Sequence, residues 1–404
     1  MAPGTRNLDP HVNLSKSSRY HCAKRRADGA AILAGTTLLL ALLLTRASTA
    51  LRTAVDGPPA AYAAVLCALC GVVLLPLAWY RGYRLERQYE LSDVRFHRWL
   101  AGRLKAGALM LALAAPVAEL VYRAMRWPSV WWLIAAAGCA AAMALATAAG
   151  PVLLVPFLHG SRPVEREVLR HRLERLSRRA GIPVLSVHEV PLGERTRRAS
   201  AALVGAGTTR RILLSDTLLA SYSDDEIEVV MAHEMGHHVH RHMLKASAVE
   251  LILLLAGFRL AAAALDAYWR WLGLASPADP AGMPLVVLAV GGVLVAATPL
   301  VNACSRSHER SADQFALETA SEPAAFIQAV RRMAAQNLAE DRPSSAAFLF
   351  FHTHPTAEER IAAARDVLAG QRREEKAGMN GSGMNGSGMN GSRSEIPGGP
   401  PEAD

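Results

Sequence analysis

The segment Val230-Met231-Ala232-His233-Glu234-Met235-Gly236-His237 carries the pattern His-Glu-x-x-His and is expected to be helical. Four residues make about 1.1 helical turns, so the imidazoles of His233 and His237 lie on one helix face and can share a zinc ion. Glu234 leans toward the open position of such a metal, where a carboxylate can take a proton from zinc-bound water and later protonate a leaving amine. The segment therefore predicts a catalytic zinc site with Glu234 as general base, with a chance match as the alternative.

A catalytic zinc needs a third protein ligand, for which a downstream acidic residue or histidine in a helix is a candidate. Glu309 and Asp313 are spaced four residues apart, on one helical face. Glu309 can bind the zinc, while Asp313 can accept a hydrogen bond from the second nitrogen of a ligand histidine and fix its tautomer. The alternative is that both are surface charges of an arginine-rich helix.

The rest of the chain is strongly apolar, because 51% of its 404 residues are hydrophobic, which is high for a soluble protein. The apolar residues gather in runs close to the roughly 20 residues that a helix needs to cross a bilayer. Runs that are predicted to span the membrane lie at about 30–50, 60–80, 106–122, 130–150, 246–265 and 283–303. The first could be a signal peptide, but no convincing cleavage site follows before Arg52, so a retained helix is expected.

The formal net charge of +9 indicates membrane topology rather than nucleic-acid binding. Basic residues bunch before the first apolar run, after the second (81–105) and after the fourth (162–179), and the loops between are poorer in them. By the positive-inside rule, both termini and the active site of this multi-pass protein are expected on the cytoplasmic side of the cell membrane. The lipid bilayer is thus an expected partner, and nucleic acid is not.

Composition divides the chain into four parts. Residues 1–28 are polar and basic and are expected to form a flexible cytoplasmic arm, and residues 29–157 an amino-terminal membrane domain with four helices. Residues 158–370 are expected to form a metallopeptidase domain that includes the last two membrane helices. Residues 371–404 contain three copies of Gly-Met-Asn-Gly-Ser, which predicts a disordered, low-complexity tail.

A small α+β subdomain is expected after the fourth apolar run. A charged helix near 163–180 precedes a strand near 183–190 and a hairpin that pairs 199–204 with 211–214. Ser223 and the glutamate three residues later form a capping box that starts the helix of the His-Glu-x-x-His pattern. The fold class is therefore mainly α, a multi-pass membrane bundle with a small α+β subdomain.

Further histidines near the pattern are His238, His240, His242 and His308. They raise the alternative of a second metal, but no carboxylate cluster accompanies them. A patch of histidines at an interface is favoured, so one Zn²⁺ per chain is predicted.

The combined motifs resemble the type I CAAX prenyl protease family of membrane zinc metallopeptidases and its HtpX-type bacterial relatives. The resemblance rests on 233–237 paired with Ser305-Arg306-x-x-Glu309-x-x-Ala312-Asp313. It extends to Tyr89-Glu90-Leu91-Ser92, to Arg211–Leu219, and to His354-Pro355 with Arg360 six residues after the histidine. Roughly residues 85–365 are covered.

The resemblance implies a helical barrel that encloses a chamber, a gluzincin-like α+β subdomain and a zinc ion near the cytoplasmic side. It also implies that substrate pairs with an edge strand. By position, this substrate strand is Ala199, Ser200, Ala201, Ala202 and Leu203. His354 and Arg360 are the implied candidates for stabilising the tetrahedral intermediate, with a helix cap and a surface arginine as the alternatives.

Two features depart from this family. Where the family shows His-x-Asn-Ala, this chain has Arg198-Ala199-Ser200-Ala201, so the amide expected near the scissile carbonyl is missing, and Ser200 is left to donate one hydrogen bond. Six membrane helices are predicted against seven in the eukaryotic prenyl proteases, which implies a smaller or more open chamber.

These features predict a membrane zinc metalloendopeptidase with peptides or membrane proteins as substrates. Two substrate classes stay open: CAAX-type processing, which includes prenylated peptides, and quality control of misfolded membrane proteins. The Ala- and Arg-rich chain is typical of bacteria, and a bacterium need not prenylate proteins, which favours quality control or peptide maturation. The alternative from another class is a catalytically silent zinc-binding sensor or scaffold. A transporter is disfavoured because the spans lack an internal repeat.

Overall fold

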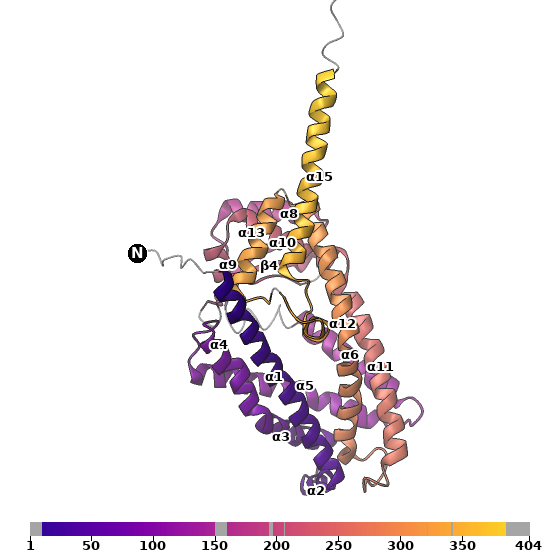
Figure 1. Cartoon of the computed structure of the whole chain (residues 1–404). Helices are drawn as coiled ribbons and strands as arrows, with labels where there is room; N and C mark the ends of the chain where they lie inside the picture. The colour runs from indigo at the N-terminus through magenta and orange to yellow at the C-terminus, as the bar shows by residue number, and fades with distance from the viewer. Residues whose placement is uncertain are drawn as a thin grey trace, which may run out of the picture.

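The computed structural model describes residues 10–149, 160–193, 197–205, 207–320, 322–340 and 342–384, and these are mostly helical (Figure 1). The helices of the first half are α1 (Pro10–Leu44), α2 (Ala47–Ala54), α3 (Pro59–Trp79), α4 (Leu85–Gln88), α5 (Phe96–Ala124) and α6 (Trp131–Ala149). Those of the second half are α8 (Glu167–Arg179), α9 (Asp216–Ser221), α10 (Asp224–Val239), α11 (His242–Tyr268), α12 (Met283–Thr319), α13 (Pro323–Gln336), α14 (Ser345–Phe351) and α15 (Ala357–Met384). The strands are β1 (Arg162–Pro163), β2 (Ser186–Val190), β3 (Ala201–Val204) and β4 (Arg211–Ser215).

The protein is a multi-pass membrane protein. Within the described residues, the helical segments long and apolar enough to cross a membrane are Lys16–Leu44, Pro59–Gln88, Phe96–Ala124, His242–Tyr268 and Pro280–Thr319. The predicted run at 130–150 corresponds to α6, whose apolar part is shorter, Trp131–Thr147. The first run was expected to reach residue 50, but α1 ends at Leu44. Arg46 there has a φ of 58°, and a left-handed residue cannot continue a right-handed helix.

Helices α1 and α3 approach α12 near α2 and separate from it toward the other end of the molecule (Figure 1). At the meeting end, the buried hydroxyl of Ser48 in α2 donates to the carbonyl of Ala281 and lies 2.6 Å from the hydroxyl of Tyr62 in α3. Tyr62 packs there beside Leu39 and Leu66. The subdomain of α8, α10 and α13 lies at the opposite end, where α15 projects beyond it.

A four-stranded sheet in the order β1-β2-β4-β3 organises this subdomain. β2 pairs parallel with β4, and β1 and β3 pair antiparallel with β2 and β4. The predicted hairpin is confirmed, because Ala201–Val204 of β3 pairs with Arg211–Leu214 of β4. β3 is an edge strand, and the carbonyl oxygen of Leu203 lies 3.2 Å from Nε2 of His238 in α10.

The subdomain core holds α10 in place. Leu169, Leu173 and Leu176 occupy one face of the amphipathic helix α8 and are fully buried. They belong to the same apolar cluster as Ile212 of β4 and Met231 of α10. Burying one such side chain stabilises the fold by about 1.5–3 kcal/mol. The helix with the His-Glu-x-x-His pattern is therefore fixed by its apolar face.

Residues 1–9 of the expected flexible arm at 1–28 lie outside the described part of the chain, and the rest differs from the expectation, because α1 is helical from Pro10. Tyr20 is 1% exposed, and its hydroxyl donates to Glu86 over 2.6 Å. The hydroxyl of Ser17 lies 2.8 and 2.7 Å from the carbonyl oxygens of Leu338 and Ala339. These partners are 66 and more residues away in sequence, so the local composition could not indicate them.

The expected disordered tail at 371–404 also begins differently, because α15 continues to Met384. Residues 371–377 read Gln-Arg-Arg-Glu-Glu-Lys-Ala, all strong helix formers, which extend the helix as far as the repeats, and its last turns at 378–384 include the first repeat. Residues 385–404 lie outside the described part of the chain.

Candidate metal centre

α10 begins at the predicted capping box and crosses α12 at close range. The hydroxyl of Ser223 accepts the N–H of Glu226 at 3.2 Å, and the Glu226 carboxylate accepts the N–H of Ser223 at 2.8 Å. Further along α10, a Cβ added to Gly236 would lie only 3.0 Å from the Cα of Ala312 in α12. Glycine at this position thus permits the close approach that brings Glu309 next to the histidines.

His233, His237 and Glu309 come together as the sequence predicted. One ligand atom from each lies within 4.8 Å of the others. The Nε2 atoms of His233 and His237 are 3.2 Å apart, and each lies 3.4 Å from an oxygen of Glu309. No other group of this kind occurs among the described residues.

This triangle fits a zinc ion. With Zn–N distances of about 2.0–2.1 Å, two ligands of a tetrahedral site lie about 3.3 Å from each other. The separations between the three side chains match that spacing. Two imidazoles and one carboxylate leave one position of a tetrahedral zinc open, as catalytic sites do.

Asp313 and Arg360 lie behind His233. The Nδ1 of His233 is 2.8 Å from Oδ1 of Asp313, on the ring side opposite the triangle. Arg360 donates to both carboxylate oxygens of Asp313, over 2.8 and 2.6 Å. Asp313 therefore lies where it can fix the tautomer of His233, and Arg360 in turn holds the Asp313 carboxylate.

The two histidines have opposite pKa shifts in the metal-free protein. Burial lowers the pKa of His233, but contacts with Asp313 and Glu309 outweigh it and raise this pKa to about 9. Burial and the neighbouring His233 lower the pKa of His237 to about 4. Near neutral pH, His233 therefore carries a proton on both ring nitrogens and His237 on one, and a zinc ion bound here would replace the additional proton of His233.

His354 lies at the rim of the centre. Its Nδ1 is 2.8 Å from Oε2 of Glu309, the same buried oxygen that lies 3.4 Å from Nε2 of His233. The side chain of His354 is 62% exposed, so its ring can also reach a ligand in the adjoining cavity.

A cavity of about 300 Å³ opens beside the triangle. Its polar side includes Glu234, and burial raises the pKa of this carboxyl above its usual range. Its other side is apolar and consists mostly of α13 and the loop after it: Phe326, Ala329, Val330, Met333, Ala334 and Ala339. The sequence analysis did not predict this wall, because α13 is a separate helix that follows the helix of Glu309.

The predicted substrate strand, 199–203, overlaps β3 but begins two residues before it. Ser200 pairs with Ser215: its carbonyl accepts the Ser215 N–H, and its N–H donates to the Ser215 hydroxyl, both over 2.9 Å. Hydrogen-bonding direction alternates along an antiparallel strand, so the backbone groups of Ala201 and Leu203 face the open edge. The exposed side chain of Ser200 lies at the start of that edge.

The remaining histidines form a patch rather than a second metal group within the described residues. The ring of His242 is stacked against His308 at 4.3 Å and against His240 at 5.4 Å. Its Nδ1 also lies 3.0 Å from Nδ1 of His237, a contact that the sequence did not predict.

Two family models match the chain. Residues 163–368 match peptidase family M48, and residues 8–159 match the CAAX prenyl protease N-terminal model, described as five membrane helices. Both descriptions agree with the resemblance that the motifs predicted.

Similar proteins come from bacteria and yeast. An uncharacterized metalloprotease YhfN of Bacillus subtilis (strain 168) is 29% identical over 310 residues, covering 74% of this chain and 71% of that protein. A protease HtpX homolog of Nostoc punctiforme is 29% identical over 65% of this chain and 96% of its own length. The CAAX prenyl protease 1 of Saccharomyces cerevisiae is 28% identical over 184 residues, 45% of this chain and 40% of that protein.

The fold is also found in a solved structure. The crystal structure of S. mikatae Ste24p superposes with a TM-score of 0.78 over 90% of this chain and 91% of that one, at 21% identity. The predicted mainly α membrane fold with its small sheet is thereby confirmed.

Proposed function

This chain belongs to peptidase family M48 and is a membrane metalloprotease, and on that premise we propose that it is a zinc metalloendopeptidase acting at the cytoplasmic face. The observation that carries the proposal is the triangle of His233, His237 and Glu309 at zinc-ligand spacing, with Glu234 on the adjoining cavity. These three side chains would hold one Zn²⁺ per chain. When bound there, zinc supplies a Lewis acid that lowers the pKa of a water molecule to about 7.

Glu234 is the proposed general base. Its carboxylate takes the proton of the attacking water and passes it to the nitrogen of the leaving amine, so one group serves both steps. Its partly buried position raises its pKa, which makes it a better proton acceptor than an exposed glutamate. Asp313 and Arg360 keep His233 oriented from behind.

His354 is the proposed stabiliser of the oxyanion in the tetrahedral intermediate. Its ring borders the cavity and is exposed enough to donate to a bound substrate. Arg360 was the other candidate from the sequence; because it donates twice to Asp313, we assign it a positioning role.

The substrate is proposed to lie along β3 as an added strand. The outward backbone groups of Ala201 and Leu203 can bind an extended peptide without regard to its side chains. One of these groups, the Leu203 carbonyl, is also in contact with His238. The apolar cavity beyond the metal group would then receive a hydrophobic side chain next to the scissile bond.

A cytoplasmic orientation is supported by the distribution of basic residues. The second membrane helix ends in the segment Tyr80–Gln88, which includes α4 and lies on the side of the α8–α10–α13 subdomain (Figure 1). This segment carries Arg81, Arg84 and Arg87. α15 projects from this same side. By the positive-inside rule this side faces the cytoplasm. Protease treatment of inside-out membrane vesicles should therefore remove the carboxy-terminal tail, whereas in right-side-out vesicles it should be protected.

Two substrate classes are candidates for this activity. The names CAAX prenyl protease 1 and HtpX belong to relatives of similar identity, so they favour peptide processing and membrane quality control about equally. We propose cleavage of extended peptide segments next to an apolar residue, with prenylation as an optional feature of the substrate.

The test uses the detergent-purified full chain with quenched fluorescent peptides. One peptide ends in a farnesylated CAAX sequence, a second is identical but without the lipid, and unfolded casein serves as a third substrate. Glu234→Ala should retain its zinc and lose turnover by about 10²–10⁴-fold, the usual contribution of general acid–base catalysis. Glu318→Ala, an exposed acid on α12, is the control and should match the wild type.

The alternative is a zinc-binding sensor or scaffold without catalysis. It would be established if wild type and Glu234→Ala both hold one zinc ion and neither cleaves any of the three substrates. Cleavage of the farnesylated peptide alone would select CAAX processing, and cleavage of casein would select quality control.

A further inference from the structure

The second ligand histidine has its own partner, at the start of the next helix. His242 is the first residue of α11, and the residue before it, Arg241, turns the chain with a φ of 53°. This turn folds His242 back beside the last turn of α10. Its side chain is buried, with 4% of the residue exposed. A buried imidazole at this place requires hydrogen-bond partners for both ring nitrogens.

Both partners are present. The Nδ1 of His242 lies 3.0 Å from Nδ1 of His237, and its Nε2 lies 3.0 Å from the hydroxyl oxygen of Ser311 on α12. The Ser311 hydroxyl donates in turn to the carbonyl of His308, over 2.9 Å. A continuous chain of hydrogen bonds therefore leads from the metal triangle to a backbone carbonyl.

The His308 carbonyl at the end of this series determines which atom donates in each of its hydrogen bonds. A carbonyl can only accept, so the Ser311 hydroxyl donates to it and accepts from Nε2–H of His242. A neutral His242 with its proton on Nε2 has a lone pair on Nδ1, which accepts from Nδ1–H of His237. His237 must then carry its lone pair on Nε2, the atom that faces His233 and Glu309.

We propose that His242 and Ser311 are positioning residues that hold His237 in the tautomer whose Nε2 binds the metal. The proposal rests on the zinc site proposed above. It gives His237 a neutral counterpart of the Asp313–Arg360 pair that orients His233. The two ligand histidines are thus oriented by different partners: His233 by the charged Asp313 and His237 by the neutral His242.

The stacked histidines His308 and His240 support the orientation of the His242 ring. His308 stacks on one side of His242 with an interplanar angle of 13°, and His240 stacks at 24°. These two near-parallel contacts restrict tilting of the His242 ring and so help to keep its Nδ1 directed at His237. The patch of histidines thereby has an explanation that needs no second metal.

The test is zinc affinity, measured by competition with a chromophoric chelator on the detergent-purified full chain. His242→Phe keeps a flat ring but removes the acceptor, and loss of such a partner weakens zinc binding by about 10–100-fold. His242→Asn places an amide oxygen near the position of Nδ1 and should recover most of the affinity. Ser311→Ala should give an intermediate loss, because His242 can then adopt either tautomer.

His171→Phe is the matched control, since His171 is an exposed histidine on α8. It should bind zinc as the wild type does. Wild-type affinity in His242→Phe would overturn the proposal, and so would equal losses in His242→Phe and His242→Asn, which would indicate packing alone. If thermal unfolding shows that His242→Phe does not fold, Ser311→Ala is tested by the same measurement of zinc affinity. Unchanged affinity in Ser311→Ala would then refute the positioning role of His242 and Ser311.

The zinc-affinity test does not depend on whether the protein cleaves peptides. If the protein binds zinc tightly and the variants lose affinity in the expected order, but no substrate is cleaved, the proposed enzymatic activity is refuted. The positioning role of His242 and Ser311 would still stand. If the protein cleaves peptides but its zinc affinity does not depend on the residue at position 242, the positioning role is refuted and the enzymatic activity stands.

Discussion

Arg25, on the first membrane helix, forms a two-pronged ion pair with Glu340, in the loop between α13 and α14. The Glu340 side chain is only 6% exposed. Its neighbour Ala339 lines the cavity beside the metal triangle. Ser17 of α1 holds the same loop through the Leu338 and Ala339 carbonyls. Helix α1 therefore fixes one wall of the candidate active site from outside the metallopeptidase subdomain.

Removing one partner of this pair should destabilise the protein. Arg25→Ala leaves the buried Glu340 without its counter-charge, a change that costs about 3 kcal/mol in comparable buried pairs. The midpoint of thermal unfolding in detergent should fall. Arg26→Ala, at the exposed neighbouring position, is the control and should leave the midpoint unchanged. Equal midpoints for the two variants would show that the pair contributes nothing.

The same pair should make stability depend on pH. Burial raises the pKa of Glu340, but the hydrogen bond and charge of Arg25 outweigh it and hold this pKa below its usual value. A carboxyl with a lowered folded pKa contributes stability above its unfolded pKa of about 4.3, and this is lost as the pH falls through the folded value. The unfolding midpoints of wild type and Glu340→Gln should therefore differ at pH 6 and converge in acid. A difference that stays constant down to acid pH would contradict this.

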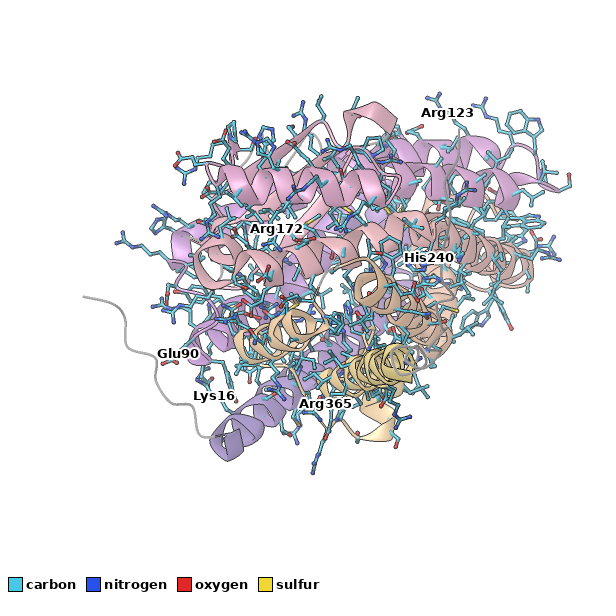
Figure 2. The ribbon with its side chains drawn as sticks, turned by 90° about the horizontal axis from the view of Figure 1, so that it is seen from above. Lys16, Glu90, Arg123, Arg172, His240 and Arg365 are labelled. Atoms are coloured by element: carbon cyan, nitrogen blue, oxygen red, sulfur yellow. The ribbon has the colours of Figure 1, made fainter. Side chains whose placement is uncertain are left out.

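Ion pairs at the periphery of the molecule are a different case. Lys16 of α1 and Glu90 lie together at one edge of the molecule, 3.4 Å apart, and the Glu90 side chain is 65% exposed (Figure 2). Exposed pairs of this kind contribute about 0–1 kcal/mol. Lys16→Ala should accordingly shift the unfolding midpoint much less than Arg25→Ala, and an equal shift would refute this ranking.

Asp313→Asn should weaken zinc binding. The amide keeps the size of the side chain but removes the charge that faces His233 and Arg360. Affinity should fall by about 10–100-fold, as for other partners of zinc-bound histidines. Chelator competition measures it, with Glu318→Gln on the same helix as the control. Unchanged affinity would mean that Asp313 does not orient His233.

Gly236→Ala should disturb the crossing of α10 and α12. The new Cβ would meet Ala312 Cα at 3.0 Å and Phe315 Cβ at 3.2 Å, so the helices must move apart. Overpacking of this kind costs about 1–3 kcal/mol, and zinc affinity should fall as Glu309 moves away. In Gly102→Ala a Cβ has no atom within 4 Å, so this helical control should be neutral or slightly stabilising. Wild-type zinc binding in Gly236→Ala would show that the crossing tolerates a methyl group.

Ala334→Phe should change substrate preference. Ala334 is a half-buried residue of the apolar cavity wall, and a phenyl group there fills part of the space. kcat/KM should fall by about 10–200-fold for peptides with a bulky apolar residue next to the scissile bond, and little for those with alanine there. Ala335→Phe, one position along on the exposed face, should have no effect. Equal losses for both peptide types would place the substrate side chain elsewhere.

The sequence by itself determined the candidate metal ligands and most of the elements. Helical spacing is local, so His233 and His237 had to share a face, and the capping box at Ser223 had to start their helix. Apolar runs of membrane length likewise indicate spans without any tertiary information. These signals lie within one or two turns of the chain.

Only the tertiary structure decided which residues support that site. Ser17, Arg25 and His242 approach Leu338, Glu340 and His237 through packing of separate helices, and no periodicity relates their positions in the chain. Residues 10–28 of the expected flexible arm are helical for the same reason, because their partners lie 66 and more residues away. Local patterns report the conformation of a segment, whereas the partner of a buried polar group is fixed by where the helices cross.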